Sequence, residues 1–188
     1  ARDVAQRELI TDVIERDTGA IYPTKHVQRM AELGFLGMLV DVKYDGGGMD
    51  TVSYVLAMEE ISKVDSSCSV IMSVNNSLVC YGLEAFGTEA QKEKYLKPLA
   101  RGEKIGAFLL SEPNAGSDAT SQKTIAADMG DYYLVNGTKN WITNGNTAGT
   151  YLLIAQTHPE KMHKGINCLI VGRHARCVRV GSPEDFRG

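Results

Sequence analysis

One polar segment of the sequence has the residue types of an anion-binding turn. It is Ser-Glu-Pro-Asn-Ala-Gly-Ser-Asp at residues 111–118, and it follows a hydrophobic run. Such a turn can direct several backbone N–H groups and two hydroxyls toward one point, which suits a pyrophosphate. The same residues could also form a plain strand-to-loop connection, because Pro and Gly are frequent where a turn needs their geometry. Spacing alone leaves both interpretations open.

A second segment could contact a planar ring. It is Asn-Trp-Ile-Thr-Asn-Gly at residues 140–145. On a β-strand, Trp141 and Thr143 project to the same face. The indole could then stack on a heterocycle while the hydroxyl hydrogen-bonds to it. The alternative is a Trp in the core of a sheet with an ordinary strand Thr beside it.

The remaining polar motifs favour structural roles. Ser-Val-Asn-Asn-Ser at residues 73–77 lies in a helical stretch, where buried amides must find partners, and internal partners are the simpler interpretation. Glu59 and Glu60 are adjacent on a helix, so they face different ways and do not form a two-carboxylate site. The glycines at 46–48 favour a turn over a phosphate loop, because no Lys-Ser/Thr follows them. No nucleophile elbow, P-loop or G-x-G-x-x-G motif is present.

We expect no metal centre, because the cysteines and histidines lack the spacing of metal ligands. The cysteines are interpreted as free thiols in a reducing compartment. The histidines are interpreted as structural or surface residues. The eight residues are Cys68, Cys80, Cys168, Cys177, His26, His158, His163 and His174.

The composition excludes several classes of protein. The chain has 188 residues, 43% of them hydrophobic and 23% charged, which is typical of a globular protein. The net charge is -3 and no basic cluster is present, so we expect no nucleic-acid partner. No apolar run approaches the roughly 18 residues of a spanning helix, and the first residues do not resemble a signal peptide. We therefore expect no membrane insertion.

The first half of the chain has the apolar periodicity of helices. Pro23 in a first turn and Gly34 after a last turn delimit one helix. Thr-Glu-Ala-Gln at residues 88–91 has the pattern of a capping box, and Gly102 is placed to end the helix that it opens. Residues 66–86 are apolar or small all round, which predicts a helix buried between other helices.

The second half has the pattern of short strands. An Asn-Gly pair at residues 136–137 lies between two strand-like runs and predicts a hairpin turn. No helical segment alternates with the runs, which disfavours a doubly wound parallel sheet. The predicted fold is α+β, with an N-terminal all-α helical domain at residues 1–103 and a small antiparallel β-barrel domain at residues 104–188. The runs cover residues 105–110, 124–126, 132–135, 140–143, 151–156 and 166–171.

Seven motifs follow one another along the chain to about Val171. Four of them are Met-Ala-Glu-Leu-Gly-Phe-Leu-Gly-Met at 30–38, Phe-Gly-Thr-Glu-Ala-Gln-Lys at 86–92, Leu-Ser-Glu-Pro-Asn-Ala-Gly-Ser-Asp at 110–118 and Asn-Gly-Thr-Lys-Asn-Trp-Ile-Thr-Asn at 136–144. The others cover residues 44–50, 58–62 and 164–166. In this order and at these spacings, the series resembles the N-terminal helical and middle β domains of the acyl-CoA dehydrogenase family. Residues 71–78 are similar to the short-chain, butyryl-CoA branch.

The resemblance implies a flavin site in the second half of the chain. It assigns FAD as cofactor, with the isoalloxazine beside the Trp-Ile-Thr segment and the phosphates near the Gly-Ser turn. Ser117 also matches a contact to the acyl-CoA substrate. The residues that match cofactor contacts are Phe108, Leu110, Ser111, Gly116, Ser117, Trp141, Ile142 and Thr143.

The resemblance also implies a reaction. A flavoprotein oxidoreductase of fatty-acid β-oxidation would convert an acyl-CoA, by this branch a short-chain one, to the trans-2-enoyl-CoA and pass electrons to an electron-transfer flavoprotein. The family's catalytic glutamate belongs to a C-terminal four-helix domain that is absent from this chain. No catalytic residue is therefore assigned here, and the base is expected beyond residue 188. The family also implies a homotetramer.

Three functional interpretations remain open from the sequence. The parent protein is expected to be a dehydrogenase, while this stretch of chain alone is expected to turn over little or no substrate. An acyl-CoA oxidase-like flavoenzyme is an alternative, and no feature of the 188 residues separates the two. A non-catalytic binding or oligomerisation module is the third. A bacterial cytoplasm and a mitochondrial matrix both suit free thiols.

Overall fold

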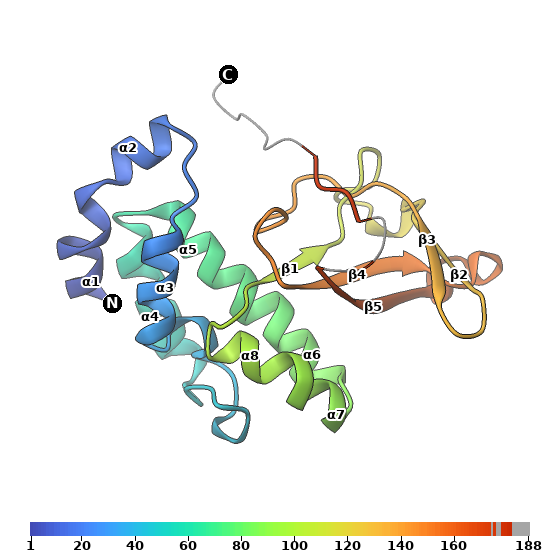
Figure 1. The fold of residues 1–188 in the computed structure, drawn as a ribbon, viewed down its shortest axis with the longest axis horizontal. Helices are drawn as coiled ribbons and strands as arrows, with labels where there is room; N and C mark the ends of the chain where they lie inside the picture. Colours follow the sequence, from blue (N-terminus) through green and yellow to red (C-terminus); the bar gives the residue numbers. More distant parts are fainter. Residues whose placement is uncertain (174, 176–177, 182–188) are drawn as a thin grey trace. The chain divides into compact units, whose positions relative to one another are not determined.

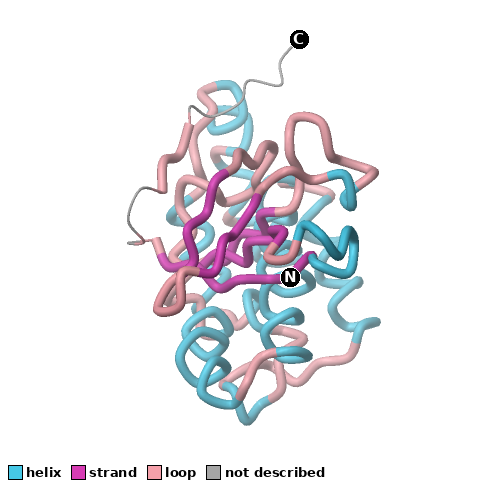
Figure 2. The backbone as a smooth tube through the Cα atoms, turned by 90° about the vertical axis from the view of Figure 1, so that its right-hand side faces the viewer, coloured by secondary structure: helices cyan, strands magenta, loops and turns pink. Residues whose placement is uncertain are grey.

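In the computed structural model, the described residues are 1–173, 175 and 178–181. They divide into two compact units, a helical unit at Ala1–Gly106 and a sheet unit within Ala107–Glu184 (Figure 1). Each unit is described by itself below. Figure 2 separates the helical segments from the strands by colour. No helix within the described residues is long and apolar enough to cross a membrane.

The helical unit encloses one core of apolar side chains. Leu9, Met30, Leu36, Ile61 and Met72 are all fully buried in it. Two π-helical stretches, Val74–Cys80 and Lys92–Leu96, each join consecutive helices without a break. The helices are α1 (Arg2–Arg7), α2 (Val13–Thr18), α3 (Thr24–Glu32), α4 (Thr51–Ser62), α5 (Ser66–Ser73), α6 (Tyr81–Phe86), α7 (Glu89–Gln91) and α8 (Lys97–Ala100).

The helix ends follow the capping rules that the sequence indicated. The Thr88 side chain accepts from the Gln91 backbone N–H, and the Gln91 side chain accepts from that of Thr88, so the predicted capping box is confirmed. Gly34, just after α3, has φ +76°. Gly102 has φ +70° after α8. Left-handed backbone of this kind favours glycine, which explains why both helices end there.

The helix over residues 66–86 is less enclosed than its composition predicted. Val70, Leu78, Tyr81 and Phe86 are exposed on it. Its buried face carries Asn75, whose side chain is fully buried among backbone groups. Within this unit the neighbouring helices therefore cover only one face of this helix, and its burial between helices on all sides stays a prediction.

The sheet unit contains five described strands in one mixed sheet. β1 and β2 both pair with β4, β3 pairs with β2, and β5 pairs with β4. β4 and β5 are antiparallel along seven residue pairs, whereas β2 meets β4 in parallel at Ile125 and Gln156. The strands are β1 (Gly106–Leu109), β2 (Ile125–Asp128), β3 (Tyr133–Asn136), β4 (Thr150–Gln156) and β5 (Ile166–Gly172).

The α+β class is confirmed, but three details of the predicted sheet change. The described strands form an open sheet rather than a closed barrel, and one pairing is parallel. Residues 140–143 are irregular and lead into a turn at residues 143–147, instead of forming a sixth strand. The hairpin turn lies at residues 129–132, where Gly130 has φ +90°. Gly137 serves close packing instead, because a Cβ there would lie 2.2 Å from the Thr124 hydroxyl.

Candidate functional site

The two segments with ligand-binding residue types lie side by side in the sheet unit. The Asn140 backbone N–H donates to the Ser111 carbonyl at 2.9 Å. The Lys139 ammonium donates to the Leu110 carbonyl, also at 2.9 Å. The segment that continues from β1 is therefore fixed against the segment that leads to Trp141. Residues separated by about thirty positions in the sequence therefore meet. We call the region formed by residues 108–118 and 139–144 the edge of the sheet unit.

A buried ion pair holds this edge together. The Lys139 ammonium lies 2.8 Å from Glu112 Oε1, and the two side chains are only 7% and 6% exposed. The Glu112 carboxylate also accepts from the Lys123 and Thr124 backbone N–H groups, at 2.6 and 3.0 Å. The third contact of the ammonium is Gln122 Oε1, at 3.1 Å. Each charge is thus compensated by its counter-ion and by dipoles.

These contacts keep Glu112 ionised. Burial by itself would raise the pKa of the carboxyl. The hydrogen bonds from Lys123, Lys139 and Thr124 stabilise the carboxylate more strongly, and they lower the pKa from 4.5 to about 2. At neutral pH, the edge therefore contains a fixed, internally neutralised pair of charges.

The turn after Glu112 presents backbone N–H groups to solvent. Glu112 and Ala115 exchange two backbone hydrogen bonds, of 3.0 and 3.1 Å, which close the turn. Gly116 and Ser117 follow, both exposed, and their N–H groups donate to no described residue. A Cβ built on Gly116 would meet nothing within 4 Å. Both residues are therefore open to solvent, and their N–H groups are of the kind that can bind an anion.

The second segment forms a tight turn with an exposed indole. Trp141 and Asn144 have φ values of +61° and +65°, which are uncommon for residues other than glycine. The expected strand geometry is therefore wrong, and with it the argument that Trp141 and Thr143 share a strand face. Ile142 packs against the cluster of Ala107, Ala148 and Tyr151 and anchors the turn. The Trp141 side chain is 58% exposed.

The candidate residues differ in their exposure. Phe108, Leu110 and Ile142 are half-buried. The hydroxyls of Ser111, Ser117 and Thr143 make no hydrogen bond to any described residue. An exposed planar ring, three available hydroxyls and an open Gly-Ser turn suit a ligand that combines a flat heterocycle with phosphates. These residues fit a flavin nucleotide.

The amides of residues 73–77 are used inside the helical unit, as expected. Asn75 Nδ2 donates to the carbonyls of Leu36 and Leu99 at 2.8 and 3.2 Å, and its Oδ1 accepts from the Gly106 N–H at 2.8 Å. Asn76 Nδ2 donates to the Phe35 carbonyl at 2.8 Å. Both amides connect segments of the core, so they are structural.

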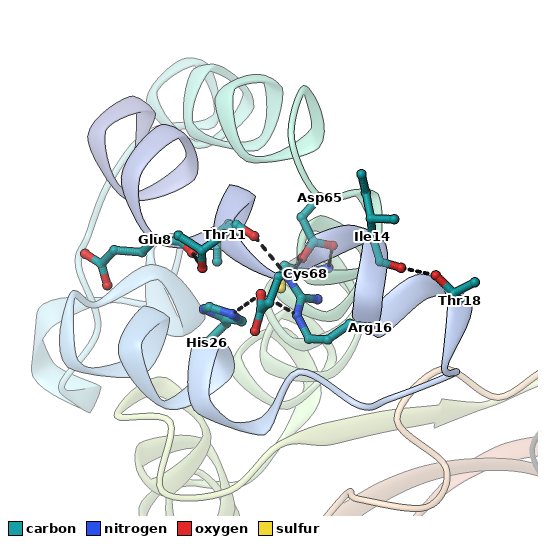
Figure 3. A network of polar contacts seen from close by, with 10 residues as sticks. Glu8, Thr11, Ile14, Arg16, Thr18, His26, Asp65 and Cys68 are labelled. Atoms are coloured by element: carbon teal, nitrogen blue, oxygen red, sulfur yellow. Dashed lines mark hydrogen bonds and ion pairs between the residues drawn. The ribbon is translucent and has the colours of Figure 1, made fainter.

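Other charged groups of the helical unit also form internal networks. Arg16 is buried and lies 2.8 Å from Asp65 (Figure 3). It also lies 2.9 Å from Asp12, and His26 contacts the same Asp12 oxygen at 2.8 Å. Glu60 binds Arg2 through both oxygens, at 2.6 and 3.0 Å, which agrees with a structural role. The turn at residues 45–49 hydrogen-bonds back to residues 37–40.

No group of three or more potential metal ligands occurs among the described residues. Cys68 and Cys80 are buried free thiols, and burial raises the pKa of each. Cys168 is also free and is exposed. His174 and Cys177 lie outside the described residues, so the expectations for them remain predictions.

Glu112 and Lys139 are not among the site residues that the sequence predicted. Both stand inside the motifs that were singled out, Ser-Glu-Pro-Asn and Thr-Lys-Asn-Trp. The sequence shows only a single acid and a single base, each beside a turn with ligand-binding residue types. Their pairing across 27 positions is a tertiary contact that local pattern does not contain.

The fold defines a class of α+β protein in which a helical unit precedes a mixed sheet that carries the candidate ligand edge. Two family models match it in succession. The acyl-CoA dehydrogenase N-terminal domain matches residues 1–103, and the acyl-CoA dehydrogenase middle domain matches residues 107–188. The chain belongs to the acyl-CoA dehydrogenase family.

Curated relatives match the whole chain. A short-chain specific acyl-CoA dehydrogenase of Clostridium acetobutylicum is 41% identical over 187 residues, which are 100% of this chain and 49% of the relative. A 3-(aryl)acrylate reductase of Clostridium sporogenes is 42% identical over 188 residues, 100% of this chain and 50% of the relative. The chain spans about half the length of the curated relatives it matches.

Solved structures share the fold. Butyryl-CoA dehydrogenase from Megasphaera elsdenii is 40% identical with a TM-score of 0.93, over 98% of this chain and 49% of that chain. A glutaryl-CoA dehydrogenase from Mycobacterium smegmatis in complex with FADH2 is 35% identical with a TM-score of 0.85, over 92% and 43% of the two chains.

Proposed function

We propose that the protein to which this chain belongs is an FAD-dependent acyl-CoA dehydrogenase that acts on short-chain substrates. The observation that carries the proposal is the edge of the sheet unit, where Trp141 is exposed and the hydroxyls of Ser111 and Thr143 bond to no described residue. The similarity to short-chain acyl-CoA dehydrogenases supports the reaction, namely α,β-dehydrogenation of an acyl-CoA to the trans-2-enoyl-CoA.

The residues of this chain would bind and orient the cofactor. Trp141 and Thr143 would contact the isoalloxazine, with the Thr143 hydroxyl donating to its polar edge, and Ser111 would donate beside them. The N–H groups of Gly116 and Ser117 would receive the phosphates. Phe108, Leu110 and Ile142 would exclude water from the ring, and Ser117 would also contact the acyl-CoA. When bound, FAD supplies the hydride acceptor.

The remaining roles belong to the family's other parts. We propose that a glutamate outside these 188 residues removes the α-proton, that an electron-transfer flavoprotein takes the electrons, and that the protein is a homotetramer. This stretch of chain alone is then expected to show little or no turnover. A bacterial cytoplasm or a mitochondrial matrix would suit these partners.

A second candidate is the same chemistry in the opposite direction, reduction of an α,β-unsaturated substrate. The observation that favours it is the 42% identity to a 3-(aryl)acrylate reductase, which is as high as the identity to the dehydrogenases. The edge residues would hold the cofactor in the same way for either direction, so the direction must be measured on the full-length protein.

The test is an anaerobic absorbance spectrum of the full-length protein with FAD. Bleaching of bound flavin by butyryl-CoA supports the dehydrogenase, and peroxide formation in air would instead identify an oxidase. Reoxidation of chemically reduced protein by an arylacrylate or its CoA ester, without bleaching by butyryl-CoA, would identify the reductase. A folded full-length protein that binds no flavin would overturn the proposal and leave a non-catalytic module.

A further inference from the structure

The Glu112–Lys139 pair differs from the other ion pairs of the sheet unit in its burial and in what it connects. Its two side chains are almost completely enclosed, whereas the His158–Glu160 pair is largely exposed. Every contact of the Lys139 ammonium goes to residues 110–122, which precede or follow the candidate phosphate turn. The pair therefore connects the two loops that form the candidate flavin edge.

A buried ion pair is an inefficient way to stabilise a fold. The desolvation of two charges offsets most of their attraction, and a pair of apolar residues of similar volume often stabilises a protein as well or better. The charged pair does provide directional hydrogen bonds between the two loops. The ammonium must remain within hydrogen-bond distance of Leu110, Glu112 and Gln122 at once, which fixes the register of the loops.

We propose that Glu112 and Lys139 are positioning residues for the flavin: together they hold the Leu110–Ser111 backbone against the turn that presents Trp141 and Thr143. The inference rests on the proposed function, because it concerns the same edge. Neither side chain needs to touch the flavin, since both act through the carbonyl of Leu110 and the backbone of residues 123–124.

A double substitution can separate the effect of the pair on FAD affinity from its effect on stability. Lys139→Met leaves the Glu112 carboxylate buried without its counter-ion, so it lowers both the thermal midpoint and FAD affinity. Glu112→Gln together with Lys139→Met removes both charges and restores most of the midpoint. The double variant still lacks the ammonium bond to Leu110, so its FAD affinity stays low.

A matched control lies in the helical unit. Arg16 is buried between Asp12 and Asp65 in the same way, with 8% of its side chain exposed, but it contacts no residue of the candidate edge. Arg16→Met is expected to lower the thermal midpoint by an amount comparable to Lys139→Met. The FAD affinity of its folded fraction should remain that of the wild type, because its lost contacts, to Leu9, Asp12 and Asp65, all lie in the helical unit.

The experiment measures the thermal midpoint and, by flavin fluorescence, the FAD dissociation constant of the full-length protein. It compares the wild type with four variants: Lys139→Met, Glu112→Gln, the double variant of these two and Arg16→Met. We expect FAD binding at least tenfold weaker in Lys139→Met, in Glu112→Gln and in the double variant, and unchanged in Arg16→Met. Flavin absorbance of the double variant should also lose the fine structure of an enclosed ring.

Recovery of FAD affinity together with the midpoint in the double variant would overturn the inference, since the pair would then be structural only. An unchanged affinity in every variant would overturn it as well. If a single variant does not fold, the charge-neutral double variant still decides between these outcomes. Wild type that is folded but binds no FAD is a separate result, which refutes the proposed function itself.

Discussion

Buried amides of the helical unit and polar groups at the candidate edge of the sheet unit have opposite surroundings. Asn75 is fully buried and bonded through both its nitrogen and its oxygen to backbone groups of three segments. The hydroxyls of Ser111, Ser117 and Thr143 are half-buried or exposed and bond to no described residue. The comparison separates polar groups that the fold uses from groups that it leaves available to a ligand.

Positive φ values occur in both units. In the helical unit, those at Gly34 and Gly102 end helices, where glycine is the residue that the geometry favours, and two smaller residues, Ala20 and Asp45, hold one as well. In the sheet unit, Trp141 holds a positive φ although it is a bulky residue. Unfavourable backbone of this kind persists where surrounding contacts over-determine it, and it is enriched at ligand sites. The contrast therefore predicts different consequences of substitution in the two units.

The largest expected effect is on stability, at Asn75. Asn75→Ala leaves the Leu36 and Leu99 carbonyls and the Gly106 N–H without their partner and opens a cavity, so the free energy of unfolding should fall by about 4 kcal/mol. Urea unfolding followed by circular dichroism measures it, with the exposed Gln28→Ala on α3 as control. FAD affinity of the folded protein should not change. A loss below about 1 kcal/mol would contradict a structural role.

The second expected effect is the pH dependence that Glu112 contributes. The pKa of its carboxyl is about 2 in the folded chain and 4.5 ordinarily, so it stabilises the fold fully above pH 4.5 and progressively less as the pH falls toward 2. The shift corresponds to about 3 kcal/mol. Unfolding free energies of wild type and Glu112→Gln should therefore converge between pH 4.5 and 2. Parallel curves through this window would contradict the lowered pKa.

Local sequence pattern predicted the parts of the fold that depend on near neighbours. The capping box at Thr88 and the α3 end at Gly34 are determined by residues within a few positions, and both are confirmed. The glycines at 46–48 form a turn as expected, although the backbone bonds of that turn reach back to residues 37–40. The helix over residues 66–86 was also expected, but its composition does not show which of its faces the neighbouring helices of this unit cover.

The errors concern contacts between distant residues. The run at 140–143 has the composition of a strand, yet the turn at Trp141 replaces it, since the Asn140 N–H pairs with Ser111 and Ile142 enters the core. Gly137 marked a hairpin in the sequence, whereas its actual constraint is the approach of Thr124. For the same reason, motifs pointed to the loops of the candidate site but not to the Glu112–Lys139 pair that connects them.

The third expected effect is the opposite of that at Asn75: FAD affinity falls while stability stays unchanged. Ser111→Ala and Thr143→Ala remove hydroxyls that bond to no described residue, so the free energy of unfolding should change by less than about 0.5 kcal/mol. Each should weaken FAD binding about tenfold, because a hydrogen bond to the ring is lost. Fluorescence titration of the full-length variants measures this. Thr147→Ala, which removes an exposed hydroxyl outside the candidate set with one long bond, 3.4 Å to the Asn144 carbonyl, is the control and should bind FAD normally.

The smallest effect is expected at Gly116, a glycine that a bound phosphate would need but the fold does not. An added Cβ would meet no atom within 4 Å, and the residue does not have a positive φ, so the fold does not require glycine there. Gly116→Ala should leave the unfolding free energy within about 0.5 kcal/mol of wild type. If phosphates approach this turn, the new methyl group crowds them, and FAD binding should weaken about threefold.

Gly172→Ala provides the control for this last prediction, because a Cβ there also meets nothing within 4 Å but lies at the end of β5. It should change neither stability nor FAD affinity. Weaker binding in Gly116→Ala alone would mean that the glycine is needed by the ligand rather than by the chain. Equal FAD affinity in the two variants would place the phosphates elsewhere, and the open space at residues 116–117 would then have no part in the site.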